Sequence, residues 1–199
     1  MYYNGVYHML YHYNSYAVVW GNITWAHSIS YVLVKWVNLG HALNPIDPCD
    51  INGCWTGSAT IFPEEELVII YIGVDTEIRQ FQYRALAKNI SNPLHREWMK
   101  SPHNPIMTPI DGIDASNFRN PITALQALLK VWRILDGSLR NSHGITLFFR
   151  SRDFVNWNKS QTPLHSSNKT GMWECADFYS LSNMHKLFTF NPYSSKMCI

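Results

Sequence analysis

Leu67-Val-Ile-Ile-Tyr-Ile-Gly73 is an uninterrupted apolar run that follows the turn Pro63-Glu-Glu-Glu66. A short apolar run bounded by turn residues predicts a strand that is buried on both faces. The three glutamates are expected to form a solvated turn and not a cluster of catalytic carboxylates.

Short strand patterns separated by turn residues continue on both sides of this run. In residues 6–14, Val6, His8, Leu10 and His12 alternate with tyrosines and Met9, which predicts a buried strand. Residues 17–37 predict two short strands with Gly21-Asn22 as the turn between them, and residues 40–53 predict a loop. Further strands are predicted at residues 55–60, 79–87, 144–150 and 186–190, and residues 158–170 predict a loop rich in Ser, Asn and His.

The composition describes a globular chain. The 199 residues are 46% hydrophobic, 14% aromatic and 15% charged, with a net charge of +2. Eight Trp and eleven Tyr suit carbohydrate-stacking surfaces or an aromatic-rich β core, and the absence of a basic stripe argues against nucleic-acid binding. No apolar run is long enough for a membrane span, and Met1-Tyr-Tyr-Asn-Gly5 lacks a signal-peptide pattern, which leaves a cytoplasmic location open for the chain as written.

The cysteines and histidines do not predict a metal site or a disulfide scaffold. Cys49, Cys54, Cys175 and Cys198 are too few and too irregularly spaced, so they are interpreted as packed thiols. His8 and His12 share one face of a predicted strand, which explains their spacing without a metal. No metal and no cofactor are expected.

Lys169-Thr-Gly-Met-Trp-Glu-Cys-Ala-Asp-Phe178 places one carboxylate, Glu174, between an indole and a thiol and follows it with Asp177. A carboxylic acid that loses water beside Trp173 is expected to keep its proton to higher pH, which suits a general acid. The alternative is that Glu174 is an ordinary residue at the end of a strand.

Other motifs occur upstream of Glu174 in a fixed order. They are Trp20-Gly-Asn-Ile-Thr-Trp-Ala-His-Ser28, Asp50-Ile-Asn-Gly-Cys-Trp-Thr-Gly-Ser-Ala-Thr60, Asn117-Phe-Arg-Asn-Pro121, Trp132-Arg-Ile-Leu135, Arg150-Ser-Arg-Asp-Phe154 and Met172-Trp-Glu-Cys175. Together the motifs resemble the plant acid invertases of glycoside hydrolase family 32, of the cell-wall β-fructofuranosidase and fructan exohydrolase type. The resemblance covers nearly the whole chain.

The fold that this resemblance implies agrees with the strand patterns. An all-β fold is expected, and the resemblance specifies an incomplete five-bladed β-propeller. Residues 1–199 would form a partial propeller domain of about the first three blades, with the C-terminal β-sandwich of the family absent. Residues 124–135 look helical on propensity, but the family has two strands joined by a turn there, and the family pattern is adopted.

The resemblance also assigns catalytic positions. Glu174 would be the acid/base of a retaining hydrolysis of β-fructofuranosides, whereas the nucleophile belongs to a motif that precedes Met1 in relatives and is absent from this sequence. Asn120 occupies the position of the aspartate that stabilises the cationic transition state. An amide there removes a negative charge, and losing one oriented electrostatic group costs about 2.7 to 4 kcal/mol of transition-state stabilisation.

The resemblance also implies substrate contacts, and the sequence itself contains candidate glycosylation sites. His12 stands where the family has a glutamine that contacts the fructosyl ring, Trp20 and Trp55 match walls of the sugar pocket, and Arg119 belongs to the motif that contains Asn120. Glycosylation candidates are Asn22, Asn89, Asn158 and Asn168, each in an Asn-X-Ser/Thr triplet.

Two functions remain open on the sequence. The first is a β-fructofuranosidase that hydrolyses sucrose or fructans. The second is a catalytically inactive relative, at best a weak sugar-binding protein, because it lacks the nucleophile and carries Asn120. By resemblance the protein would be secreted to the cell wall or apoplast and would carry N-glycans, and it would bind neither nucleic acid nor membrane.

Overall fold

The computed structural model describes residues 1–18, 21–62, 66–110, 112–126 and 130–176. Within these ranges every regular element is a β-strand apart from η1, a short 3-10 helix at Ala115–Asn117. The all-β class expected from the sequence is therefore confirmed.

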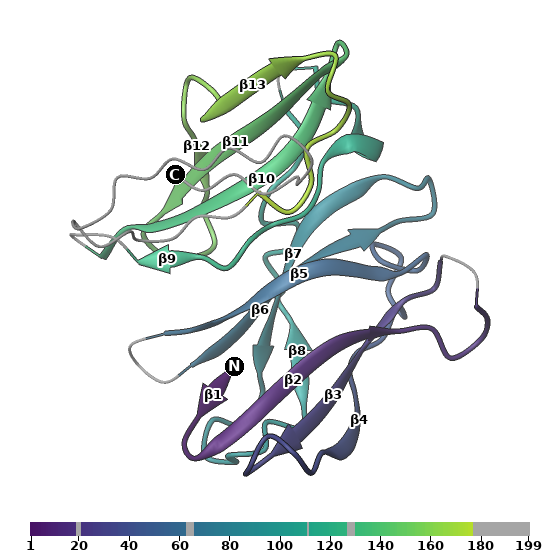
Figure 1. Cartoon of the computed structure of the whole chain (residues 1–199), viewed down its shortest axis with the longest axis vertical. Helices are drawn as coiled ribbons and strands as arrows, with labels where there is room; N and C mark the ends of the chain where they lie inside the picture. The colour runs from purple at the N-terminus through teal and green to yellow at the C-terminus, as the bar shows by residue number, and fades with distance from the viewer. Residues whose placement is uncertain (19–20, 63–65, 111, 127–129, 177–199) are drawn as a thin grey trace.

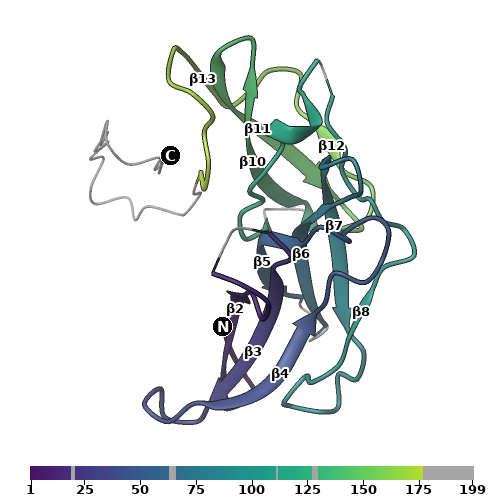
Figure 2. The ribbon, with the colours of Figure 1, turned by 90° about the vertical axis from the view of Figure 1, so that its right-hand side faces the viewer.

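The strands form three antiparallel sheets that follow one another along the chain (Figures 1 and 2). Within each sheet, strands that are consecutive in sequence pair as neighbours, apart from β12 and β13 at the edge of the third sheet. This arrangement agrees with about three propeller blades. Sheet 1 contains β1 (Tyr2–Tyr3), β2 (Val6–Tyr13), β3 (Thr24–Ser30) and β4 (Val37–Leu43); sheet 2 contains β5 (Cys54–Ile61), β6 (Leu67–Val74), β7 (Gln80–Ala87) and β8 (Trp98–Lys100); sheet 3 contains β9 (Leu125–Gln126), β10 (Trp132–Arg140), β11 (His143–Ser151), β12 (Asn158–Lys159) and β13 (His165–Asn168).

Strand β6 packs against both neighbouring sheets. All eight of its residues are buried, as the apolar run predicted. Because successive side chains of a strand point to opposite faces, Val68 and Ile70 pack into the apolar cluster shared with sheet 3. Ile69 and Tyr71 pack into the cluster shared with Trp25 of sheet 1. One strand thus holds both neighbouring sheets in place.

Sheet 1 departs from the expected strand pattern. The described residues among 17–23 contain no strand, because the Asn14 side chain accepts hydrogen bonds from the backbone of Tyr16 and Ala17 and donates one to the Gly21 carbonyl. The expected strand at residues 6–14 is present as β2, but only its first half is buried. Strand β4 continues into the expected loop at residues 40–53, because Gly40 adopts φ +96° in an irregular pairing with β3.

Sheet 3 resolves the disagreement over residues 124–135 in favour of strands. Leu125 and Gln126 pair with β10, which begins at Trp132, because hydrogen bonding and core packing within the sheet override the helical propensity. The polar segment 158–170 is not only a loop, since it contains β12 and β13, both paired with β11. Edge strands that face water need no apolar alternation, which is why the sequence pattern missed them. The strand expected at residues 186–190 lies outside the described residues.

Three buried histidines meet between sheets 1 and 2. His8 on β2 lies 3.0 Å from His27 on β3 between Nδ1 and Nε2, and the His8 and His95 rings are 5.6 Å apart. Burial and the neighbouring His95 lower the pKa of His8 to about 4, and burial together with His8 lowers the pKa of His27 to about 4. Folding with these rings neutral contributes stability above their unfolded pKa near 6.5, and this stability is lost as the pH falls through 4.

A carboxylic acid is buried between sheets 2 and 3. Asp136 on β10 has no exposed surface, and Gln82 on β7 donates a hydrogen bond to its Oδ2. Its other oxygen, Oδ1, has no hydrogen-bond partner among the described residues. Burial raises the pKa of Asp136 well above its ordinary value, because a charge without a cation is poorly solvated there.

Asp136→Asn is expected to stabilise the protein increasingly as the pH rises. The folded state holds the Asp136 proton while the unfolded state releases it near pH 4, so wild-type stability falls as the pH rises toward the folded-state pKa. The gap in unfolding free energy between variant and wild type should grow by about 1.4 kcal/mol per pH unit from pH 4 up to the folded-state pKa of Asp136 and then level off. Urea denaturation between pH 4 and 8 measures this gap, and a pH-independent gap would contradict a buried, protonated Asp136.

Candidate active site

Arg119 and Glu174 form an ion pair at the edge of sheet 3. Arg119 Nη2 lies 2.7 Å and Nε 3.1 Å from Glu174 Oε1. A second terminal nitrogen, Nη1, donates to Gln80 Oε1 and to the Ser116 carbonyl, each at 3.1 Å. The guanidinium is therefore fixed by three partners, and it presents the carboxylate in one orientation.

The backbone on both sides of the ion pair is anchored to β10. The Arg119 amide donates to the Gly137 carbonyl at 3.2 Å, and the Ile122 amide donates to Leu135. The Glu174 segment crosses the same hairpin so closely that a Cβ at Gly137 would lie 1.9 Å from the Trp173 carbonyl oxygen. A Cβ at Gly144 would lie 2.0 Å from the Trp173 ring. Two glycines on β10 and β11 therefore allow Glu174 to reach Arg119.

Glu174 is not in the dehydrated setting that the sequence suggested. The Trp173 ring points away to His165, with ring centroids 4.4 Å apart, and its Nε1 donates to Thr170. The Glu174 side chain keeps 43% of its surface exposed. The expectation of an acid dehydrated by Trp173 is wrong, because the Trp173 ring packs on Gly144 and His165 and not on Glu174. Asp177 lies outside the described residues.

Asn120 lines a small cleft of about 230 Å³ together with Thr56, Ser58, Thr123 and Cys175. Its Nδ2 lies 3.5 Å from Cys175 Sγ, and the residue is almost fully buried. The expectation that Cys175 is a packed thiol is wrong, since a turn with φ +53° leaves this residue exposed. The same expectation holds for the buried Cys54, whereas Cys49 is half-buried and Cys198 lies outside the described residues.

The expected sugar-pocket residues are brought together only in part. The exposed ring of His12 packs edge-on against Trp25, with centroids 5.6 Å apart, and Trp25 Nε1 donates to the Trp55 carbonyl at 3.0 Å. His12 and half-buried Trp55 thus both contact Trp25, a residue that no sequence argument singled out as a contact. Trp20 lies outside the described residues.

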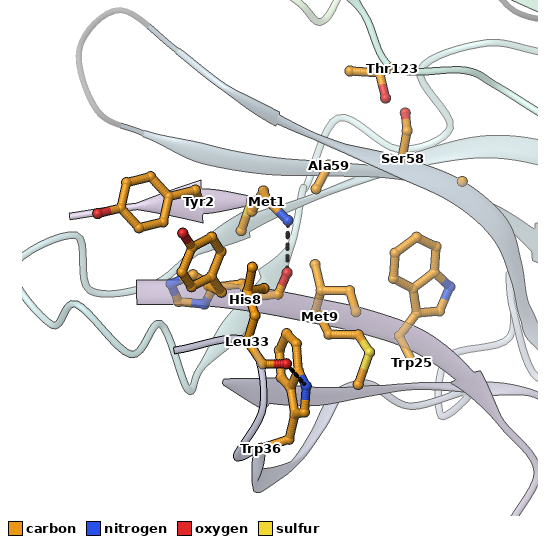
Figure 3. Close-up of a pocket in the computed structure, with 13 residues that line it drawn as sticks. Met1, Tyr2, His8, Met9, Trp25, Leu33, Trp36, Ser58, Ala59 and Thr123 are labelled. Carbon is orange, nitrogen blue, oxygen red and sulfur yellow. Dashed lines mark hydrogen bonds between the residues drawn. The ribbon is translucent and has the colours of Figure 1, made fainter. Parts of the chain in front are cut away.

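A larger cleft of about 800 Å³ opens between sheets 1 and 2 (Figure 3). Figure 3 shows the Ala59 side chain turned toward Met9, whereas the Ser58 hydroxyl points the other way, toward Thr123. This cleft shares Gly57, Ser58 and Thr123 with the cleft at Asn120, so the two adjoin. Sequence reasoning missed three residues of the candidate site: Gln80, which contacts Arg119, and Ser58 and Thr123, which line both clefts. Ser58 carried a signal, because it lies within the Trp55–Thr60 motif, whereas Gln80 and Thr123 carried none.

The remaining sequence candidates lie on the surface of the described part of the chain. All four glycosylation candidates, Asn22, Asn89, Asn158 and Asn168, are exposed. No group of three His, Cys, Asp or Glu residues arranged to hold a metal ion occurs within the described ranges. A search of the same residues finds no helix of the length and apolarity that crossing a membrane requires.

Comparison with known sequences places the chain in a family. The profile described as "Glycosyl hydrolases family 32 N-terminal domain" matches residues 1–198. The chain is 47% identical over 191 residues to the cell wall isozyme of beta-fructofuranosidase from Pisum sativum, covering 95% of this chain and 34% of the relative. An insoluble isoenzyme of beta-fructofuranosidase from Arabidopsis thaliana is 47% identical over 92% of this chain and 32% of the relative. The chain thus spans about one third of the length of these relatives.

Solved structures support the propeller fold. Fructan 1-exohydrolase IIa from Cichorium intybus matches 87% of this chain with a TM-score of 0.83 and 45% identity, over 32% of its own length. The GH32 beta-fructofuranosidase of Bombyx mori matches 90% of this chain with a TM-score of 0.74 and 29% identity, over 37% of its own length. The expected β-propeller class is confirmed.

Gly137→Ala is expected to displace the Glu174 segment, because the new methyl group would overlap the Trp173 carbonyl. Overpacking of this kind costs about 1 to 3 kcal/mol, which lowers Tm by several degrees in a chain of this size. Ser138→Ala is the matched control, since the buried Ser138 hydroxyl has no partner in the described part of the chain. Calorimetry should show a lower Tm for Gly137→Ala alone, and equal Tm values would contradict the close approach.

Gln80→Leu is expected to loosen Arg119, because it removes one of the acceptors of Nη1. A hydrogen bond to a charged group contributes about 1.5 to 3 kcal/mol, so hydrogen exchange of the Arg119 Nη1–H should accelerate roughly tenfold or more. ¹⁵N NMR exchange rates measure this, with Gln161→Leu on the exposed loop of sheet 3 as control. Unchanged exchange would mean that Glu174 and Ser116 fix Arg119 without Gln80.

Proposed function

The chain belongs to glycoside hydrolase family 32, and from this premise we propose that the protein is a hydrolase of the β-fructofuranosidase type. It would remove terminal β-fructofuranosyl residues from sucrose or fructans by retaining hydrolysis, in which a carboxylate nucleophile that residues 1–199 do not supply would take the fructosyl group before water releases it. The observation that carries the proposal is the Glu174 carboxylate, partly exposed and held by Arg119 in one orientation.

Glu174 is suited to general acid catalysis by position. Its ion pair uses only Oε1 among the described contacts, so Oε2 is available to donate a proton to the leaving glycosidic oxygen and later to take one from water. Arg119 orients the carboxyl group. The tether to Gln80 keeps the guanidinium from following a substrate that enters the cleft.

The fructosyl unit would occupy the cleft at Asn120. Its hydroxyl groups would find hydrogen-bonding partners in Thr56, Ser58 and the Asn120 amide, all of which line that cleft. The adjoining larger cleft, with Trp25 and Trp36 in its lining, would take the rest of a sucrose or fructan chain against apolar surface. His12 and Trp55 would act at the rim, through Trp25.

A second function is favoured by one observation, the neutral side chain at Asn120. An oxocarbenium-like transition state is stabilised by negative charge, and an amide supplies only an oriented dipole. Asn120 also donates toward Cys175, so its dipole is directed in part by a thiol. On this reading the chain binds fructosides without hydrolysing them.

The relatives that carry the names cell wall isozyme and insoluble isoenzyme support a location at the cell wall for this protein as well. The four exposed asparagines would then carry N-glycans. Mass spectrometry of glycopeptides from the source tissue tests both the secretion route and the occupied sites.

Fructose release from sucrose and 1-kestose by the protein isolated from its source, and by variants of that full chain, tests the two functions. Glu174→Gln should lower kcat by about 10² to 10⁴, because general acid catalysis is lost. Glu97→Gln, which changes an exposed carboxylate paired with Lys88, is the matched control and should leave kcat unchanged.

Asn120→Asp decides between hydrolysis and binding alone. If the site is catalytic, the restored charge should raise kcat by about 10² to 10³ with little change in the affinity for fructose. The Cys175 thiol can donate to a carboxylate, so the variant has a partner for its new oxygen. An isolated protein that binds 1-kestose but releases no fructose, with or without Asn120→Asp, would establish the second function.

A further inference from the structure

A buried acid lies between the two strands that hold Arg119. The Arg119 side chain is attached to β7, because it donates to Gln80 Oε1 at 3.1 Å, and its amide is attached to β10, because it donates to the Gly137 carbonyl at 3.2 Å. Asp136 directly precedes Gly137 on β10. It accepts a hydrogen bond from Gln82, which lies two residues after Gln80 on β7. The acid and both anchors of Arg119 therefore share the same pair of strands.

The Gln82 side chain also contacts the segment that leads to Arg119. Its amide nitrogen donates to Asp136 Oδ2 and lies 3.4 Å from the carbonyl oxygen of Phe118, the residue before Arg119. Both Gln82 and Asp136 are completely buried. Because one amide group contacts both the acid and the Phe118 carbonyl, a change in the charge of Asp136 acts on the backbone just ahead of Arg119.

The groups packed around Asp136 are neutral. Gln82 on β7 offers an amide, and the Phe118 segment offers a carbonyl. Side chains that cross-strand pairing places on the same face of β10 and β11 come from Ile134, Ser138, Ile145 and Leu147. Asp136 has no ion-pair partner within the described ranges.

The charged residues of the neighbouring segments have other partners. Asp114, which caps η1, is exposed and accepts hydrogen bonds from Ser116. Arg119 and Glu174 pair with each other. In the described part of the chain, nothing therefore compensates an ionised Asp136, and the interface between sheets 2 and 3 accommodates the neutral acid.

We propose that the Asp136 proton is a switch for the ion pair between Arg119 and Glu174. With the proton bound, β7 and β10 stay in contact and Arg119 holds Glu174 in one orientation. When the proton is lost to solvent, the buried carboxylate requires hydration, and water reaches it only if the two strands move apart. Arg119 spans these strands, so its hold on Glu174 loosens. Asp136 is thus a positioning residue that acts through Gln82 and Gly137.

The direction of the response follows from the burial of Asp136. The proton stays bound below the folded-state pKa and is lost above it, so the ion pair is tight in acid and loosens as the pH rises. The consequence for hydrolysis rests on the function proposed above, whereas the response of the ion pair does not. The two can therefore be tested separately.

Hydrogen exchange of the Arg119 Nε–H in the full chain measures the switch, because this group donates to Glu174. Its rate is divided by that of the exposed Arg152, which removes the general acceleration of exchange with pH. This exchange ratio should rise roughly tenfold or more as the pH is raised from 4 until the protein unfolds, because a charge-assisted hydrogen bond is loosened. A constant ratio over the whole range would overturn the proposal.

Infrared spectroscopy follows the proton itself. The band of a protonated carboxyl group that Asp136→Asn lacks belongs to Asp136, and in the wild type it should disappear with the same midpoint as the rise in the exchange ratio. Different midpoints would assign the loosening of Arg119 to another group and would overturn the proposal.

Two substitutions separate the proton from the contact. Asp136→Asn keeps the shape of the neutral acid without an ionisable group, so the exchange ratio should stay low at every pH. Gln82→Met removes the amide that links Asp136 to the Phe118 carbonyl, so the ratio should be high at every pH although Asp136 still titrates. Glu97→Gln, which changes an exposed carboxylate, is the matched control and should respond like the wild type.

A pH response that persists in Asp136→Asn would contradict the switch. If this variant does not fold, Gln82→Met decides alone, since a ratio that still rises with pH in it would contradict the route through Gln82.

Fructose release from sucrose supplies the measurement that depends on the proposed function. Dividing kcat/KM of Asp136→Asn by that of the wild type cancels the titration of Glu174, and this quotient should grow roughly tenfold or more between pH 4 and a pH above the exchange midpoint. A quotient that does not change with pH would overturn the link between the switch and hydrolysis. Absence of fructose release at every pH would count against the proposed function and not against the switch, which the exchange ratio decides.

Discussion

The complete burial of β6 is the constraint on which the rest of the molecule depends. Its alternating side chains pack against sheet 1 on one face and against sheet 3 on the other. Neither neighbouring sheet could shift without opening an apolar interface, and each buried aliphatic side chain contributes about 1.5 to 3 kcal/mol. The position of Arg119 relative to Gln80 follows from this packing, because Gln80 begins the strand beside β6 and the Arg119 amide is bonded to β10 of sheet 3.

Polar groups within the same two interfaces give the fold opposite responses to pH. His8 and His27, between sheets 1 and 2, are held neutral and lose their contribution as the pH falls through about 4. Asp136, between sheets 2 and 3, is held protonated and loses its contribution as the pH rises. The histidines therefore destabilise the fold at low pH and Asp136 destabilises it at high pH. Together they favour the folded state in an intermediate, mildly acidic pH range.

The candidate active site is built from close backbone approaches as much as from charged groups. Gly137 and Gly144 let the Glu174 segment lie directly on the β10–β11 hairpin, and the backbone of Arg119 is bound to that hairpin from the other side. Glu174 therefore contacts Arg119, although the two residues are 55 positions apart in sequence. Asn120 lies beside this pair and lines the cleft. Its side chain is neutral, whereas an aspartate at this position would give the cleft a negative charge.

The sequence alone determined the all-β class, the buried strand at β6 and the strands β5, β7 and β11, and its motifs put forward Arg119, Asn120 and Glu174 as site candidates. These follow from apolar periodicity and from motif order, which are local properties of the chain. It did not determine the edge strands β8, β12 and β13, whose residues face water and carry no apolar signal.

The lack of a strand among the described residues of 17–23 and the surroundings of Glu174 became apparent only from the structure. The first depends on hydrogen bonds of the Asn14 side chain, and the second on which way Trp173 turns once the segment rests on Gly144. The Asn14 partners are near in sequence, the farthest seven residues away, whereas Trp173 rests on Gly144, which is distant in sequence. A side chain's burial and charge environment are properties of those partners, and local sequence does not encode which partners folding will bring.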